Sequence, residues 1–394
     1  MLHTLQNPTV AADRSAIARS ILRFKVWVYE GVRGSSGGPD GLAVGEFGVG
    51  SHGGVYQSRH GERRVLAQLC PGHAIGSPHH RHDADGAVFR PRHRKLLAMA
   101  RETLQGKARP DYLLFSNELN VAPEILRLSL GSGVKLFAVN NTLTADQIRI
   151  IGDLPRRYPD FIGSLVGNDE EGGYLTAKRL ISLYPRQPGG GTVEMLAFSG
   201  TNTTPVSLYR EQGLRRALAE HPEVHLRQIV LSGWLRYRAL EQARVLFNRY
   251  PDIRLVWSAN EQMAFGAMDA LRERGGQPGK DVLFSAINGT SMSLQAQLDG
   301  RLSVVATGHF TLGGWAIILL HRYDTAHRQT HLQAGARTVE VLHLVERQDA
   351  QRFLEATRSE GYRLDLQAFN VSATGEDSPF SLKNMLPDAH SSAR

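Results

Sequence analysis

Short apolar runs recur along the chain from about residue 112, and each is typical of a strand that is buried on both faces of a sheet. The runs are continuous rather than alternating, and polar or turn-forming residues bound them. The predicted strands are residues 112–116, 134–139, 162–166, 193–199, 226–231, 253–258, 282–287 and 303–307.

Apolar residues with helical spacing fill the gaps between these runs. The first stripe of this kind is Leu97, Ala100 and Leu104. Three later stripes are Gly173, Ala177, Leu180, Ile181 and Tyr184; Leu240, Ala243, Phe247 and Tyr250; and Ala264, Ala267, Met268 and Leu271. Strand and helix therefore alternate, which predicts an α/β fold with a mostly parallel sheet and helices on both faces.

Residues 1–90 differ from the rest of the chain. They hold 14 of the 40 glycines and 7 of the 16 histidines, and they lack a sustained apolar period. Glycine, serine and proline at this density interrupt helices and strands. We therefore expect little packed structure there, either because this is an atypical extension or because it is an altered, out-of-frame reading of the N-terminal unit.

Composition limits the class of protein. A length of 394 residues favours two or three domains, and one cysteine, Cys70, excludes an internal disulfide or a zinc site made of several cysteines. No apolar run approaches the roughly 18 residues that span a bilayer, so we predict no direct membrane insertion. The net charge of +8 is spread along the chain and predicts no nucleic-acid partner.

Polar side chains follow almost every predicted strand. In parallel sheets ligands bind at the carboxyl ends of strands, so these residues are candidates for a binding site. They are Ser116, Asn117 and Glu118; Asn140 and Asn141; Asn168 and Asp169; Thr201, Asn202 and Thr203; Asn260 and Glu261; Asn288 and Thr290; and His309. Asparagine both donates and accepts hydrogen bonds, as sugar hydroxyls do. A single asparagine after a strand is more often a turn former or helix cap. The recurrence of such residues at almost every strand end is what favours a binding site.

Three other patterns carry little weight. Gly48, Gly50 and Gly53 match a dinucleotide-binding spacing, but no convincing strand precedes them and no acidic residue follows at the required distance. The histidines and aspartates between His79 and Asp85 are adjacent in a stretch without a regular pattern, which favours adventitious metal binding. We find no catalytic triad or nucleophile elbow, and predict neither a cofactor, nor a specific metal, nor an enzyme.

Four ordered segments resemble the type I periplasmic binding proteins, the ribose- and galactose-binding group of ABC transporter substrate-binding proteins. They are SLVGNDEEGGYLTAKRLI, FSGTNTTPVSLYREQGLRRAL, VWSANEQMAFGAMDALRERG and SAINGTSMSLQAQLDGRLSVVATGHF. The chain departs from the family pattern in the order Asn168-Asp169, in Glu261 for an aspartate, in the pair Asn288-Gly289, and in His309 where ribose-like members carry glutamine. The resemblance begins near His93, and residues 1–90 do not match.

The resemblance implies two doubly wound parallel-sheet lobes joined by a hinge that closes on a ligand. It places the first lobe at residues 91–168 and about 309–345, the second at 169–308 and about 346–375, and a tail at 376–394. The implied ligand-binding residues are Asn140, Asn141, Asn168, Asp169, Arg210, Trp234, Asn260, Asn288 and His309.

Two of these roles keep an alternative. The planar guanidinium of Arg210 suits two sugar oxygens, but the residue is also interpretable as a solvated helix arginine. Trp234 suits stacking on a sugar ring, but also suits packing at the edge of a lobe.

The function implied is capture of a sugar-like, polyhydroxylated small molecule and its delivery to an ABC transporter permease. One alternative is a receptor that presents its ligand to a membrane sensor kinase. A less favoured one is a lactose-repressor-type transcription regulator, for which residues 1–60 lack two compact helices. We expect a monomer. The periplasmic location follows from the resemblance, since no signal peptide is visible in residues 1–28.

Overall fold

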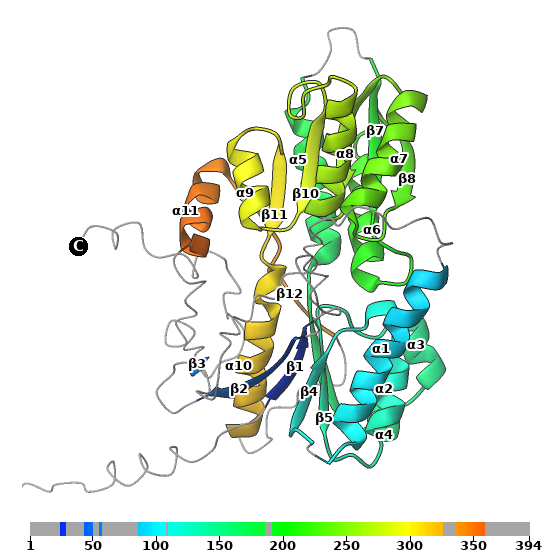
Figure 1. The fold of residues 1–394 in the computed structure, drawn as a ribbon, viewed down its shortest axis with the longest axis vertical. Coiled ribbons are helices and arrows are strands. Elements are labelled where there is room, and N and C mark those ends of the chain that lie inside the picture. Colours follow the sequence, from blue (N-terminus) through cyan, green and yellow to red (C-terminus); the bar gives the residue numbers. More distant parts are fainter. Residues whose placement is uncertain are drawn as a thin grey trace, which may run out of the picture.

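The computed structural model describes residues 24–28, 43–49, 55–56, 86–107, 109–185, 191–325 and 336–358. Two β-sheets organise these residues, one above the other in Figure 1. We call each sheet with the helices packed on it a lobe; the first lobe is the lower one in the figure.

The first sheet has the strand order β12-β6-β5-β4-β1-β2-β3. Adjacent strands are parallel from β12 to β1, whereas β2 pairs antiparallel with both β1 and β3. The strands are β1 (Phe24–Val28), β2 (Ala43–Val49), β3 (Val55–Tyr56), β4 (Tyr112–Phe115), β5 (Lys135–Val139), β6 (Phe161–Gly167) and β12 (Ala336–Val339). We predicted no strand within residues 1–90, yet β1 lies parallel to β4. β1 is only five residues long, and a glycine-rich segment begins soon after it, at Gly31. So short a run has too little hydrophobic pattern of its own to be recognised as a strand.

The second sheet has the order β13-β11-β10-β9-β7-β8. All its pairs are parallel except that between β11 and β13. The strands are β7 (Val193–Ser199), β8 (Val224–Leu231), β9 (Ile253–Ser258), β10 (Leu283–Ile287), β11 (Val304–Thr307) and β13 (His343–Leu344). The fold is therefore α/β with largely parallel sheets, as the alternation of runs and stripes predicted. The presence of two sheets agrees with the two lobes that the family resemblance implied.

Helices accompany both sheets (Figure 1). Those of the first lobe are α1 (Gly86–Gln105), η2 (Glu118–Asn120), α2 (Ala122–Ser129), α3 (Ala145–Ile151), α4 (Leu154–Arg157), η3 (His309–Thr311) and α10 (Leu312–Thr325). Those of the second lobe are α5 (Asp169–Leu183), α6 (Pro205–Ala219), α7 (Arg236–Arg249), α8 (Glu261–Glu273), α9 (Ser291–Leu298) and α11 (Arg347–Arg358). The predicted stripe on α1 packs inward, because Ala100 and Leu104 are buried.

The predicted strands match β4 to β11 to within two residues at each end. Their continuous apolar runs are buried; in β9, for example, Leu255, Val256 and Trp257 are fully covered. The Trp257 Nε1 donates a hydrogen bond to Thr176 Oγ1 of α5 at 3.0 Å, so its polar atom is satisfied within the core. The short strands β12 and β13 were not predicted, since both lie at sheet edges and most of β12 is exposed.

Helices α5 and α6 pack unusually closely because glycine faces backbone at two points. A Cβ at Gly173 would lie 2.1 Å from the Arg210 carbonyl oxygen, and one at Gly213 would lie 1.9 Å from that of Glu170. The two glycines therefore allow the backbones to touch. This approach sets the start of α5 beside the middle of α6.

Within the described ranges the chain passes between the lobes at three crossings. The first crossing joins β6 to α5 at residues 167–169, and the second joins β11 to η3 at residues 307–309. The third joins β12 to β13 at residues 340–342, close to the boundary we drew near residue 345. Each of the first two crossings leaves a strand at its carboxyl end, so the carboxyl edges of both sheets face the region between the lobes.

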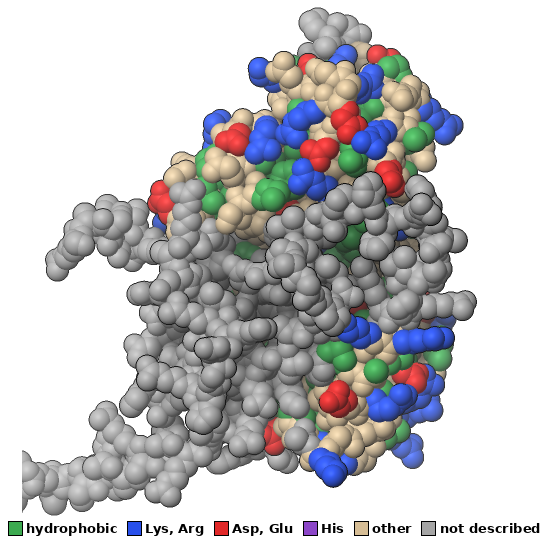
Figure 2. Space-filling view, in the orientation of Figure 1, with side chains coloured by type: hydrophobic (Ala, Val, Ile, Leu, Met, Phe, Trp, Pro, Cys, Tyr) green, Lys and Arg blue, Asp and Glu red, His purple; other side chains and the backbone are tan. Residues whose placement is uncertain are grey.

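The surface carries charges of both signs. Figure 2 shows Lys and Arg side chains interspersed with Asp and Glu on the upper lobe, over the part of the visible face that the structure describes. Among the described residues, no helix is both long and apolar enough to cross a membrane.

Candidate functional site

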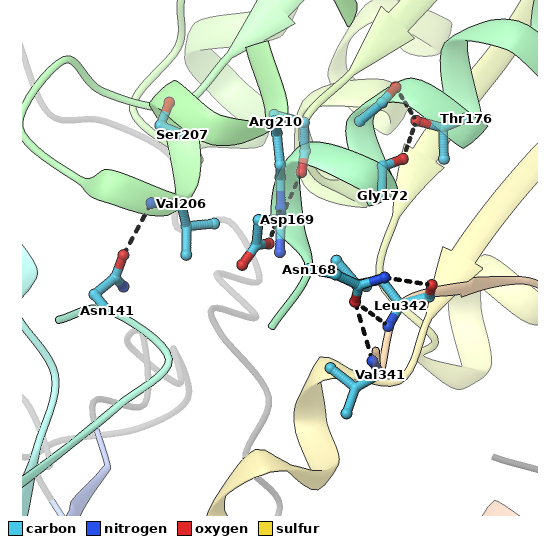
Figure 3. Close-up of polar contacts among 12 residues, drawn as sticks. Asn141, Asn168, Asp169, Gly172, Thr176, Val206, Ser207, Arg210, Val341 and Leu342 are labelled. Atoms are coloured by element: carbon cyan, nitrogen blue, oxygen red, sulfur yellow. Dashed lines mark hydrogen bonds and ion pairs between the residues drawn. The ribbon is translucent and has the colours of Figure 1, made fainter. Parts of the chain in front are cut away.

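The region between the lobes holds a buried ion pair. Arg210 on α6 donates from Nε to Asp169 Oδ1 at 2.8 Å and from Nη1 to the Ala259 carbonyl oxygen at 2.8 Å (Figure 3). Both side chains are 3% exposed, so the interpretation of Arg210 as a solvated helix residue is wrong. Burial raises the pKa of Asp169, and the adjacent guanidinium opposes that shift.

Trp234 lies next to this pair. Its ring centroid is 6.0 Å from the Arg210 guanidinium carbon, and a Cβ at Gly200 would lie 2.2 Å from its ring. The indole therefore packs against Gly200 at the end of β7 and offers a flat apolar surface beside a cation. This position is compatible with both interpretations of Trp234, as a lobe-edge aromatic and as a stacking platform.

Asn260 and Asn288 lie at the carboxyl ends of β9 and β10, and both are buried. Asn260 caps helix α8, since its Oδ1 accepts from the Met263 N–H at 2.9 Å, and its Nδ2 donates to the Trp234 carbonyl oxygen at 3.3 Å. The Asn288 carbonyl oxygen accepts from Ser293 Oγ at 3.0 Å. A cap role, left open for every strand-end asparagine, is therefore present at Asn260.

Asn168 ties two of the crossings together. Its Oδ1 accepts from the Val341 N–H at 3.0 Å and the Leu342 N–H at 2.8 Å, and its Nδ2 donates to the Leu342 carbonyl oxygen at 3.4 Å (Figure 3). The amide thus bonds to backbone of the third crossing. Asn168 acts in the hinge, and a ligand contact from it stays a prediction.

Asn140 and Asn141 follow β5 in the first lobe and differ from each other. Asn141 is 1% exposed and uses its whole amide: Nδ2 donates to Glu118 Oε1 at 2.7 Å, and Oδ1 accepts from the Val206 N–H of the second lobe at 3.0 Å. The Asn140 Oδ1 is buried without a hydrogen-bond partner among the described residues. The Asn140 Oδ1 therefore remains able to accept a hydrogen bond from a ligand, whereas the Asn141 amide is hydrogen-bonded to other residues of the protein.

Thr307 and His309 lie at the two ends of the second crossing. His309 is 3% exposed, and neither ring nitrogen has a hydrogen-bond partner within the described ranges. Burial, reinforced by the charge of Arg210, lowers its pKa well below the ordinary 6.5, so the imidazole is neutral. Thr307 Oγ1 is likewise buried and unpartnered there. Buried polar atoms normally have a hydrogen-bond partner, so Thr307 Oγ1 and the ring nitrogens of His309 are candidates for contact with a polar ligand.

Sequence reasoning did not select two residues that join this region. Glu118 lies after β4, and its carboxylate accepts from Asn141 and, at 3.4 Å, from Thr204 Oγ1 across the lobes. Burial of that carboxylate raises its pKa. Glu118 appeared in the sequence only as one of many strand-end polar residues, and Thr204 had no distinguishing signal.

The remaining sequence candidates do not enlarge the site. No group of His, Cys, Asp or Glu in the described part of the chain has the geometry to hold a metal ion. Cys70, the residues from His79 to Asp85, and Gly50 and Gly53 lie outside the described residues, while Gly48 lies in β2. What is present is a set of hydrogen-bonding groups around one ion pair and one indole, which suits binding of hydroxyl groups.

The chain is similar to periplasmic binding proteins. A family model described as "Periplasmic binding protein domain" matches residues 164–325. A solved periplasmic sugar-binding protein from Pseudomonas fluorescens is 45% identical, with a TM-score of 0.66, and the alignment covers 74% of this chain and 86% of that one.

Two curated relatives are more distant. The galactofuranose-binding protein of Escherichia coli (strain K12) is 24% identical over 141 residues, which is 35% of this chain and 44% of that protein. The D-apiose import binding protein of Actinobacillus succinogenes is 23% identical over 212 residues, or 54% of this chain and 66% of that protein. The match thus spans less than half of the first relative. Together with the two sheets, the three crossings and the 45% identical structure, these similarities show that the chain belongs to the type I periplasmic binding proteins.

Proposed function

We propose that this protein captures a sugar-like, polyhydroxylated molecule between its two lobes without converting it. The observation that carries the proposal is a set of buried polar atoms near the lobe junction that have no hydrogen-bond partner within the described ranges. They are Asn140 Oδ1, Thr307 Oγ1 and both ring nitrogens of His309. Because they include donors and acceptors, a ligand with several hydroxyl groups suits them.

The proposal gives each neighbouring group a role. Arg210 keeps N–H groups beyond those bound to Asp169 and Ala259, and these are available to ligand oxygens. Trp234 stacks on the apolar face of the sugar ring. Asp169 fixes the orientation of the Arg210 guanidinium. Asn260 and Asn288 line the second-lobe side of the ligand site.

The names of the relatives support two parts of the proposal, which are the class of ligand and its transfer to a transporter. Their names include galactofuranose, D-apiose import and periplasmic sugar binding. We therefore propose that the protein acts as a monomer in the periplasm and hands its ligand to an ABC transporter permease. No observation favours the sensor-kinase or transcription-regulator alternatives.

A screen of neutral pentoses, hexoses and polyols by thermal shift tests the proposal. A sugar that binds raises the melting temperature with concentration, because it binds the folded state only. The screened sugar should be recovered chemically unchanged by nuclear magnetic resonance after prolonged incubation. A flat response across the panel, or conversion of the bound sugar, would contradict the proposal.

A further inference from the structure

Helix α6 of the second lobe begins without a cap of its own. Thr204 occupies the N-cap position, but its side chain makes no capping hydrogen bond, and Pro205 has no N–H. The next free donor is the Val206 N–H, and Val206 is 5% exposed. A buried backbone donor at a helix start needs an acceptor.

The acceptor comes from the other lobe. Asn141 of the first lobe accepts from the Val206 N–H through Oδ1 at 3.0 Å, as Figure 3 shows, and this contact lies apart from the hinge bond of Asn168. The Asn141 Nδ2 is fixed by Glu118 Oε1 at 2.7 Å and Ser116 Oγ at 3.2 Å. The orientation of the amide is therefore set within the first lobe, with its oxygen facing α6.

A second contact runs beside the first. The other carboxylate oxygen of Glu118, Oε2, accepts from Thr204 Oγ1 at 3.4 Å. Thr204 is 2% exposed. The bond from the Val206 N–H to Asn141 is buried, and the bond from Thr204 to Glu118 is partly buried. One pair of first-lobe residues thus satisfies both the N-cap side chain and the first free N–H of α6.

We infer that Asn141 acts as the N-cap of helix α6 across the lobe junction, and that this inter-lobe cap holds the closed arrangement and slows ligand release. The inference rests on the proposed function for its ligand, but not for its geometry. Asn141 is then a positioning residue rather than a ligand contact. Opening the lobes breaks the cap, and closing them restores it.

Asn141→Ala leaves the Val206 N–H buried and unsatisfied whenever the lobes close. We expect the ligand dissociation rate to rise roughly five- to hundredfold. This factor corresponds to the free-energy cost of a buried N–H group that has lost its acceptor. The association rate should stay unchanged, since encounter takes place in the open state. Stopped-flow kinetics with the sugar found by the thermal-shift screen measures both rates.

A ligand-free measurement separates this inference from the proposed function. Spin labels at Ile150 and Val245, exposed positions on the two lobes, report the inter-lobe distance once Cys70 is replaced by serine. The Asn141→Ala variant should show a larger open fraction without any sugar present. This result would stand even if no sugar bound.

Thr144→Ala is the matched control. Thr144 caps α3 within the first lobe, accepting from the Gln147 N–H at 3.2 Å, and makes no inter-lobe bond among those described. Its loss should lower the melting temperature and leave the dissociation rate and the distance distribution unchanged. The inference is overturned if Asn141→Ala behaves like Thr144→Ala, or if it slows association while the ligand-free distances stay the same, which is the signature of a ligand contact.

Discussion

Arg210 and Asp169 are buried together, with Nε and Oδ1 held 2.8 Å apart. A charge taken out of water is tolerated here because its partner and the Ala259 carbonyl oxygen replace part of its hydration. The same arrangement makes each charge dependent on the other. Arg210 therefore contributes to folding as well as to the proposed site.

Replacing Arg210 by alanine leaves the Asp169 carboxylate buried without a counter-charge. We expect the free energy of unfolding to fall by about 3 to 5 kcal/mol. Arg215→Ala is the control on the same helix, because Arg215 pairs with Glu211 at the surface and its loss should cost at most about 1 kcal/mol. Urea denaturation measures both; equal small effects would show that the buried pair is not stabilising.

His309 gives the protein a pH dependence of known sign. Its folded-state pKa lies well below 6.5, so the folded protein binds fewer protons than the unfolded chain between those two values. Its contribution to stability therefore decreases as pH falls below about 6.5, by up to about 1.4 kcal/mol per pH unit. Glu118 and Asp169 act in the opposite direction, because burial raises their pKa values.

His309→Gln isolates the histidine from these carboxyl groups. We expect the wild type to lose stability relative to the variant between about pH 6.5 and about pH 5, since only the wild type gains this proton on unfolding. Urea denaturation across that range measures the difference. Parallel curves for the two proteins would contradict a neutral, buried imidazole at this position.

At the scale of elements, two glycines bring α5 and α6 together and so place Asp169 beside Arg210. Gly213→Ala drives a methyl group into the Glu170 carbonyl oxygen, and we expect a loss of about 1 to 3 kcal/mol from overpacking. Ligand affinity should fall as well, since the helices that carry the ion pair must separate.

Gly191→Ala is the matched control, because a Cβ there meets nothing within 4 Å. Its free energy of unfolding should stay within about 0.5 kcal/mol of wild type. Chemical denaturation measures the free energy of unfolding of the two variants, and titration calorimetry measures their ligand affinity. A tolerated Gly213→Ala would show that the helix contact is not tight.

The elements also show what sequence patterns can reveal. Strands β4 to β11 were predictable because their apolar runs are continuous, local and covered on both faces. Strands β12 and β13 were not, since short edge strands lack that pattern. The partners of the asparagines were equally hidden: Asn168 bonds to Val341 and Leu342, more than 170 residues later in the chain.

At the scale of the molecule, the three crossings act together as a hinge, and Asn168 bonds the first to the third. Asn168→Ala leaves the N–H groups of Val341 and Leu342 without their acceptor, which typically costs about 1 to 3 kcal/mol. Asn168→Asp keeps the acceptor oxygen but replaces the Nδ2 donor to the Leu342 carbonyl oxygen with a second oxygen, so it should recover only part of the lost stability. Thermal denaturation distinguishes them; equal losses for both variants would argue against the acceptor role.

In the proposed function, the two lobes close on one sugar and release it unchanged. Isothermal titration calorimetry of the screened sugar, at two temperatures, tests this most directly. We expect one site per chain, a negative heat-capacity change from burial of apolar surface, and recovery of the intact sugar. No heat of binding with any neutral sugar, or a chemically altered sugar after titration, would contradict it.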